Sequence, residues 1–157
     1  MSDIMPLTMI VMGVNDHLRC GVGWHDRAYD GRNGVCFRWT GARADFCLEV
    51  PRRASALRFM VSGPALLTGR PVPLSLYAPG RLLCHLPAAA PSDFWTIAEM
   101  TLKTLELAED NAPAQFTIRC ETFPGTRALS APFVPDRYLR NSDFRRLGIM
   151  VAAIRAV

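Results

Sequence analysis

Apolar and polar residues alternate in short runs along much of this 157-residue chain. The alternation is clearest at Phe46–Val50, Leu57–Gly63 and Gln115–Thr122, and it returns in the final run, Leu147–Ile154. Successive side chains of a β-strand point to opposite faces of a sheet. A period of two therefore predicts strands that each bury one face.

Proline and glycine separate these runs, and the 12 prolines and 11 glycines leave little room for a long helix. Pro79–Gly80 divides Val72–Leu86 into two apolar runs, which predicts a hairpin. Met9–Val14 and Val35–Thr40 are predicted as further strands. The pattern predicts an all-β fold: one antiparallel β-sandwich domain spanning residues 1–157, with at most one short helix.

Ser92–Asp110 fits two interpretations. A capping residue at its start and the Glu99–Lys103 pair favour a helix. Its threonines and the alternation of Trp95 with Ile97 favour a strand followed by an irregular or helical piece, and we expect the strand.

Two further segments are predicted as loops. Trp24–Gly34 is polar and rich in glycine, and it leads into the strand at Val35–Thr40. Phe123–Asp143 contains prolines that lack the N–H donor of a sheet, so it is expected to be a long loop rather than a central strand.

Charge and cysteine content narrow the function classes. The net charge is +4, and all but one of the 18 basic residues are arginines, scattered rather than clustered, which disfavours nucleic acid as a partner. The 5 cysteines form no C-x-x-C pair, which favours a reducing cytoplasm. The spacing of His17, Cys20 and His25 matches no standard zinc pattern, so we expect neither a metal nor another cofactor.

The beginning of the sequence resembles a strand more than a targeting signal. Asp3 precedes a short apolar stretch that has neither basic residues before it nor a small-residue cleavage site after it. No run of apolar residues reaches the length of a membrane span, so we expect a cytoplasmic protein without direct membrane insertion.

Two regions carry residues suited to sugar recognition, Gly21–Gly41 and Phe133–Arg146. Sugars are bound by aromatic faces that stack on the ring and by planar polar groups that contact the hydroxyls. The candidate ligand-binding residues are Trp24, Asp26, Arg38, Tyr138, Asp143 and Arg145.

A structural role is the competing interpretation of the same residues. Trp39 is expected in the core, on the opposite face of its strand from Arg38. A guanidinium between aromatic neighbours needs an anion or a ring on which to stack, and Asp143 is the expected partner of Arg38. This ion pair would fasten the final strand to the strand of Arg38.

Catalytic motifs are missing from the sequence. It contains no G-x-S-x-G, no phosphate-binding glycine loop followed by Gly-Lys, and no marked pair of carboxylates. We therefore predict no catalytic residues and a protein that is not an enzyme.

Three motifs together resemble a known family: "GWHD" at Gly23–Asp26, "FRWTG" at Phe37–Gly41 and "SDFRRLGIMVAAIR" at Ser142–Arg155. They resemble the galactose-binding-like, jelly-roll β-sandwich modules attached to bacterial glycosyltransferases. The resemblance implies a non-catalytic accessory module in polysaccharide or glycan biosynthesis. Its matching positions are Trp24, Phe37, Arg38, Trp39, Asp143, Arg145, Arg146, Leu147 and Gly148.

Three functional hypotheses follow. The first is a carbohydrate-binding or accessory module that recognises a glycan or a glycosylated intermediate. The second is a protein-interaction or self-assembly domain that docks a glycosyltransferase, or a second copy of the chain, without binding sugar. The third is a hydrolase that depends on His25 or Asp26.

Overall fold

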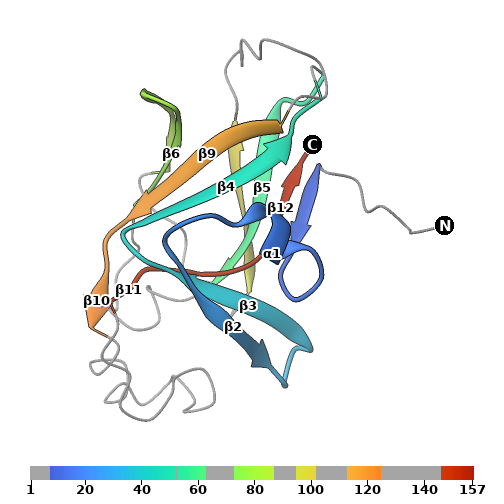
Figure 1. Cartoon of the computed structure of the whole chain (residues 1–157), viewed down its shortest axis with the longest axis vertical. Coiled ribbons are helices and arrows are strands. Elements are labelled where there is room, and N and C mark those ends of the chain that lie inside the picture. The colour runs from blue at the N-terminus through green and yellow to red at the C-terminus, as the bar shows by residue number, and fades with distance from the viewer. Residues whose placement is uncertain (1–7, 52, 63–72, 87–94, 102–112, 125–145) are drawn as a thin grey trace, which may run out of the picture.

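A computed structural model describes residues 8–51, 53–62, 73–86, 95–101, 113–124 and 146–157. They form a β-sandwich of two antiparallel sheets, with the four-residue helix α1 (Asp16–Arg19) beside them (Figure 1). The predicted all-β antiparallel sandwich is confirmed. Within the described ranges, no helix is both long enough and apolar enough to cross a membrane.

The first sheet has the strand order β2-β3-β12-β5-β8, and β1 also pairs with β12. Its strands are β1 (Met9–Val11), β2 (Trp24–Asp30), β3 (Val35–Thr40), β5 (Ala56–Ser62), β8 (Thr96–Thr101) and β12 (Met150–Ala156).

The second sheet has the order β4-β9-β6-β7. Its strands are β4 (Arg43–Glu49), β6 (Leu74–Ala78), β7 (Arg81–Leu86) and β9 (Pro113–Cys120), and a separate small pair joins β10 (Phe123–Pro124) to β11 (Arg146–Leu147).

Most of the predicted strands are present. β3 has the predicted bounds, Val35–Thr40, and β6 and β7 form the predicted hairpin around Gly80, whose φ is +69°. The strand interpretation of Ser92–Asp110 is confirmed over Thr96–Thr101, and the rest of that segment lies outside the described residues. Of the predicted loop Phe123–Asp143, the first two residues form β10 and the remainder also lies outside.

The predicted loop at Trp24–Gly34 is wrong for most of its length, because Trp24–Asp30 forms β2 and pairs with β3. β2 lies at the edge of the first sheet, so it exposes polar side chains, and its register shifts between Trp24 and Arg27. Both features disrupt the alternation by which a strand is recognised in a sequence.

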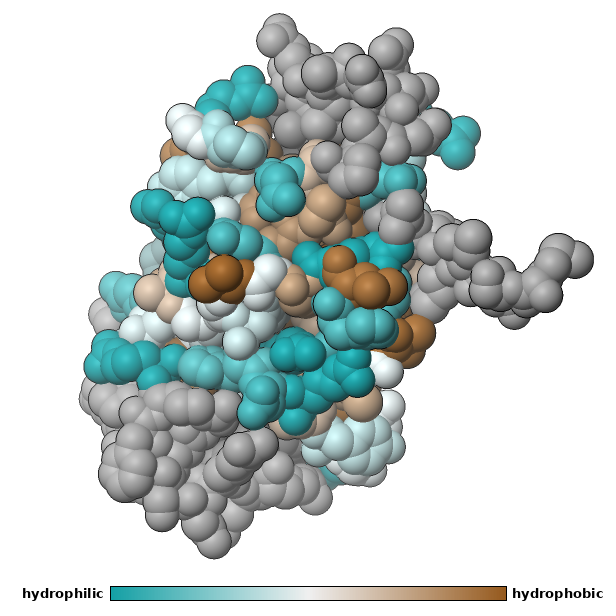
Figure 2. Space-filling view, in the orientation of Figure 1, coloured by the Kyte–Doolittle hydropathy of each residue, from teal (hydrophilic) through white to brown (hydrophobic). Residues whose placement is uncertain are grey.

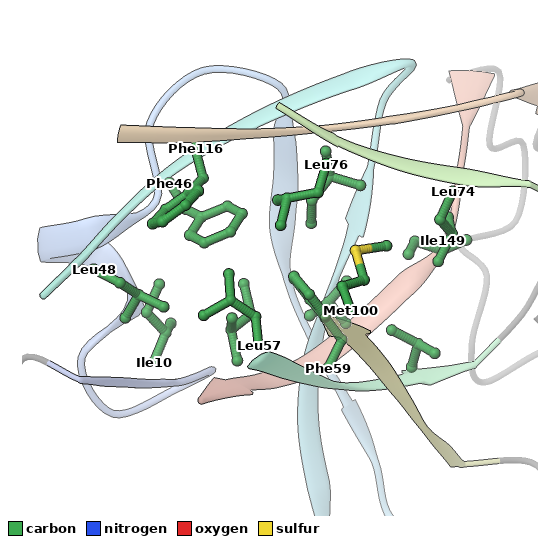
Figure 3. Packing of buried hydrophobic residues seen from close by; sticks show 14 of the residues in the cluster. Ile10, Phe46, Leu48, Leu57, Phe59, Leu74, Leu76, Met100, Phe116 and Ile149 are labelled. Carbon is green, nitrogen blue, oxygen red and sulfur yellow. The ribbon is translucent and has the colours of Figure 1, made fainter. Parts of the chain in front are cut away.

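The main core lies between the two sheets (Figure 3). Phe46 of β4 stacks on Phe116 of β9 at 5.3 Å between ring centroids and meets Phe59 of β5 edge-on at 6.0 Å. This contact joins the sheets, because Phe59 belongs to the first sheet and the other two rings to the second. Burying each such side chain contributes roughly 1.5–3 kcal/mol.

The first sheet also buries apolar residues on its other face. Phe37 and Trp39 of β3 are 0% and 2% exposed there. The ring centroids of Phe37 and Trp95 are 5.7 Å apart. The predicted alternation of β3 and the predicted burial of Trp39 are both confirmed. The first sheet is therefore apolar on two faces, and the second sheet packs its inner face on the main core.

β12 has the central position in the first sheet. One of its edges pairs with β5, and β3 and β1 pair with it as well. Just before β12, the N–H of Gly148 donates to the carbonyl of Thr40 at 2.7 Å, and the N–H of Ile149 donates to the Thr40 hydroxyl at 3.1 Å. These bonds bring together two of the motifs that carry the family resemblance.

Gly23 allows the chain to pass against the start of β4. Its φ is +95°, and a Cβ built on it would lie 1.7 Å from the backbone oxygen of Arg43. Gly80 also has a positive φ, but a Cβ there would meet nothing within 4 Å. The two glycines share the conformational requirement and differ in the space around them.

We expect Gly23→Ala to destabilise the protein much more than Gly80→Ala. The Gly80 substitution has only the backbone cost of about 1 kcal/mol, and the clash at Gly23 adds about 1 to 3 kcal/mol. Urea unfolding of both variants measures the difference. Equal losses would contradict a close approach of Gly23 to β4.

Candidate functional site

The predicted ligand-binding residues divide into two groups. Trp24, Asp26 and Arg38 are described by the structure and lie on β2 and β3. Tyr138, Asp143 and Arg145 lie outside the described residues. The structure brings the first three together with α1.

Arg38 makes an ion pair with Asp16 of α1, a residue absent from the predicted site. Its Nε donates to Asp16 Oδ2 at 2.7 Å, and its Nη1 donates to the carbonyl of His25 at 3.0 Å. The expected partner, Asp143, lies outside the described residues. Among the described residues, the carboxylate that pairs with Arg38 is Asp16.

Asp16 is fully buried and accepts three more side-chain and backbone bonds. Arg27 donates to both carboxylate oxygens at 2.9 Å, and the N–H of Gly13 donates to Oδ1 at 2.9 Å. Burial raises the pKa of Asp16, but the bonds from Arg27 and Arg38 outweigh it and lower this pKa below its ordinary value of 3.8. The group therefore stays a carboxylate shared by two guanidinium groups.

Trp24 is held by the fold as well. It packs against the main core, and its indole N–H donates to the carbonyl of Asp45 at 2.7 Å. Asp26 is exposed on β2. The ligand-binding roles of these residues stay predictions.

The histidines and the cysteine near α1 are tied into the same region. His17 Nδ1 lies 3.3 Å from Nη2 of Arg27, and His25 Nε2 lies 2.9 Å from the carbonyl of Arg146. Burial, with a smaller effect from Asp16, raises the pKa of Cys20 to about 12, so its sulfur is a thiol at neutral pH. The described residues include no group of three or more His, Cys, Asp or Glu side chains placed to hold a metal ion.

Arg146, just before the final strand, makes hydrogen bonds within the fold. Arg146 donates from Nε to the hydroxyl of Thr122 at 3.1 Å and from Nη2 to its carbonyl at 2.8 Å. These bonds fasten β11 next to β10. Arg146 thus has a structural role in this small strand pair.

The surface around α1 also exposes aliphatic side chains. Val14, Leu18 and Val22 are 54%, 74% and 80% exposed. Figure 2 shows hydrophobic patches at α1 and at the segment that follows it, among hydrophilic neighbours.

A second polar surface covers the outer face of the second sheet. The strand register aligns its side chains in two rungs that run across all four strands. One rung is Asp45, Thr117, Tyr77 and Leu82, and the other is Arg43, Arg119, Ser75 and His85. At a strand spacing of about 4.8 Å, each rung is roughly 14 Å long.

Side-chain contacts fix the groups on this outer face. The Arg119 guanidinium lies over the Tyr77 ring, 4.9 Å from its centroid. Ser75 Oγ lies 2.9 Å from His85 Nδ1. The Thr117 hydroxyl donates to Asp45 Oδ1 at 2.7 Å. An aromatic ring and oriented polar groups therefore stand together on an accessible face, where Arg119 and His85 are exposed.

The sequence analysis missed this face, although the signal was present. In "LSLYA" at Leu74–Ala78 the leucines are buried, which places Ser75 and Tyr77 on the opposite face. In "QFTIRC" the buried Phe116 and Ile118 alternate with polar residues that face outward. The polar positions of this alternation define the outer face of the sheet just as its apolar positions define the core.

Comparisons with known proteins support the fold. No protein-family model matches the chain, and no curated protein matches it. A solved structure, the C-terminal CBM6 of LamC, a marine laminarinase from Zobellia galactanivorans, superposes with a TM-score of 0.51 at 10% identity, over 95% of this chain and 98% of that one. At this identity the similarity shows that the two share a β-sandwich fold.

A second structure is similar at a lower level. It is CBM51-2 in complex with GlcNAc and INT domains from Clostridium perfringens ZmpB, with a TM-score of 0.35 and 6% identity over 83% of this chain and 24% of that chain. A score this low supports no argument about this protein.

We expect Asp16→Asn to lower the free energy of unfolding by about 3–5 kcal/mol at pH 7, because it leaves two guanidinium groups without their carboxylate. The control is Glu99→Gln, which removes the half-exposed partner of Arg58 and should cost less than about 1 kcal/mol. Urea unfolding measures both. Similar losses in the two variants would contradict the structural role of Asp16.

The wild-type protein and Asp16→Asn together test how the stability of the fold depends on pH. Because the pKa of Asp16 is lowered in the folded protein, its stabilisation is complete above the unfolded pKa of about 3.9 and is lost as the pH falls through the lower folded value. Between about pH 5 and pH 2 the wild-type protein should lose more stability than Asp16→Asn. Parallel pH profiles of unfolding would overturn this assignment.

Proposed function

We propose that this chain is a non-catalytic carbohydrate-binding module whose glycan lies along the outer face of the second sheet. The observation that carries the proposal is the pair of rungs across this sheet, with the Tyr77 ring fixed beneath Arg119. The β-sandwich fold shared with a CBM6 structure supports it.

The chemistry of this outer face suits a neutral or charged sugar. A pyranose presents apolar C–H faces to aromatic rings and hydroxyls to planar donors and acceptors. The Arg119 guanidinium lies over one face of the Tyr77 ring and offers several N–H donors in a fixed plane, and the part of the ring that it leaves uncovered would meet the sugar. The Ser75–His85 and Thr117–Asp45 pairs add groups that both donate and accept hydrogen bonds.

The predicted surface on β2 and β3 supports the proposal less well. The indole N–H of Trp24 and two donor atoms of Arg38 already have partners within the fold. Asp26 is the exposed residue of that group and is the one to test there.

In its finer form, the proposal is an accessory module for bacterial polysaccharide biosynthesis in the cytoplasm, working beside a glycosyltransferase. The family resemblance of "GWHD" and "FRWTG" supports this setting. The bound molecule would be a glycan or a glycosylated intermediate, and a second copy of the chain is a further partner to test.

A protein-docking function is the second candidate. Val14, Leu18 and Val22 expose aliphatic surface around α1, which suits a protein partner. If the chain has only this function, it should bind no sugar. Leu18→Ser should then weaken binding of the protein partner, whereas it should leave glycan binding by the outer face of the second sheet unchanged.

A glycan array followed by titration calorimetry tests the main proposal. We expect Arg119→Ala and Tyr77→Leu to weaken binding of the captured glycan at least about tenfold, because each removes contacts worth roughly 1.4 kcal/mol or more. Thermal melts of each variant check that the fold is intact.

Two controls locate the site. Arg58→Ala removes an equal charge from the first sheet and should bind as the wild-type protein does. Asp26→Ala probes the surface predicted from the sequence. Loss of binding in Asp26→Ala together with normal binding in Arg119→Ala would move the site to β2, and absence of any captured glycan would favour protein docking.

A further inference from the structure

Arg19, the last residue of α1, is a largely buried cation that forms no ion pair with the other residues that the structure describes. Its exposed fraction is 9%, and its Nε is buried with no hydrogen-bond partner. Arg19 therefore differs from Arg27 and Arg38, which share the Asp16 carboxylate.

A buried N–H without a partner is unfavourable for a folded protein. Arginine keeps its proton at any pH at which proteins fold, so it cannot avoid the cost of desolvation by becoming neutral. Buried polar groups in native structures are nearly always paired, and an exception calls for an explanation such as water, an ion or a ligand. The Nε–H of Arg19 is therefore a donor that an anionic ligand could pair.

The position of Arg19 is at the β4 border of the second sheet. Cys20, the next residue, forms a β-bridge with Phe46 of β4. The pKa of Cys47 is raised mainly by burial, while the positive charge of Arg19 lowers it, so the guanidinium lies within electrostatic reach of this thiol. Cys47 alternates with the buried Phe46 and Leu48 and thus belongs to the outer face of the sheet.

The charges around this border are mixed. Among the described residues of β4, Asp45 and Glu49 flank Cys47 on the outer face, and Arg43, which pairs with Arg119, lies four residues before Cys47. Asp45 is already engaged by Arg43 at 3.2 Å and by Thr117 at 2.7 Å. Glu49, whose negative charge raises the pKa of Cys47, is the carboxylate of this chain that could pair with Arg19 in place of a ligand.

We propose that Arg19 binds an anionic substituent, a carboxylate or a sulfate, of an acidic glycan seated on the outer face of the second sheet. This inference rests on the proposed function and specifies its ligand class. The guanidinium matches both groups through paired N–H donors, and Arg119 and Tyr77, further along the same face of the sheet, would contact other sugars of the same glycan.

The first test is stability without ligand. Arg19→Met keeps an unbranched apolar stem and removes the charge, so this variant should melt several degrees above the wild-type protein. Arg81→Met, which removes the same charge from the exposed hairpin of β6 and β7, should melt as the wild-type protein does. A lower melting temperature for Arg19→Met would mean that Arg19 stabilises the fold, for example through Glu49, and would overturn the proposal.

The second test uses polygalacturonate, dextran sulfate and neutral dextran as probes in titrations. The wild-type protein should prefer one of the two acidic polymers over dextran at least tenfold, and the preferred polymer distinguishes a carboxylate from a sulfate. Arg19→Met should lose this preference, and Arg81→Met should keep it. Equal binding of acidic and neutral polymers by the wild-type protein would overturn the proposal.

Thermal shifts with sodium sulfate at low millimolar concentration separate this inference from the proposed function. If no glycan binds but sulfate stabilises the wild-type protein and not Arg19→Met, the anion site stands and the glycan function fails. If a neutral glycan binds through Arg119 while neither sulfate nor acidic polymers depend on Arg19, the glycan function stands and this inference fails.

Discussion

The buried Asp16 carboxylate sets the arrangement of the first third of the chain. Arg27 and Arg38 are directly opposed across β2 and β3, where two like charges would repel each other. Asp16 accepts bonds from both, and in doing so it fastens α1 to the sheet. The same bonds fix the segment that places Trp24 on the core and covers the edge of β4. In a region that has the composition of a ligand site, Asp16, Arg27 and Arg38 thus have a structural role.

The two sheets differ in how many of their outward side chains are available to contact a ligand. The first sheet carries apolar clusters on both faces, with Phe59 on one side and Phe37 on the other, so much of its central part serves packing. The second sheet contributes Phe46 and Phe116 to the core and turns polar residues outward. An open polar face over a rigid apolar layer allows side chains to be exchanged without disturbing the core. The proposed glycan face has this property.

The alternation of apolar residues was sufficient to predict the sandwich, β3, the hairpin around Gly80 and the burial of Trp39. It failed at β2, where an exposed edge and a shifted register remove the period. The partner of Arg38 was also beyond sequence reasoning, because Asp16 reaches it through the tertiary placement of a four-residue helix. Long-range contacts of this kind depend on the assembled fold rather than on any local pattern.

The central position of β12 has a consequence for how the chain folds. Thr40 and Ile149 are hydrogen-bonded neighbours although 109 residues separate them. Until β12 is synthesised, β3 and β5 lack the strand that stands between them, and their unpaired edges can join other chains. Pairings of such high sequence separation form slowly, since a long loop must close first. Nascent chains of this protein therefore have a particular need for protection from aggregation until β12 has emerged from the ribosome.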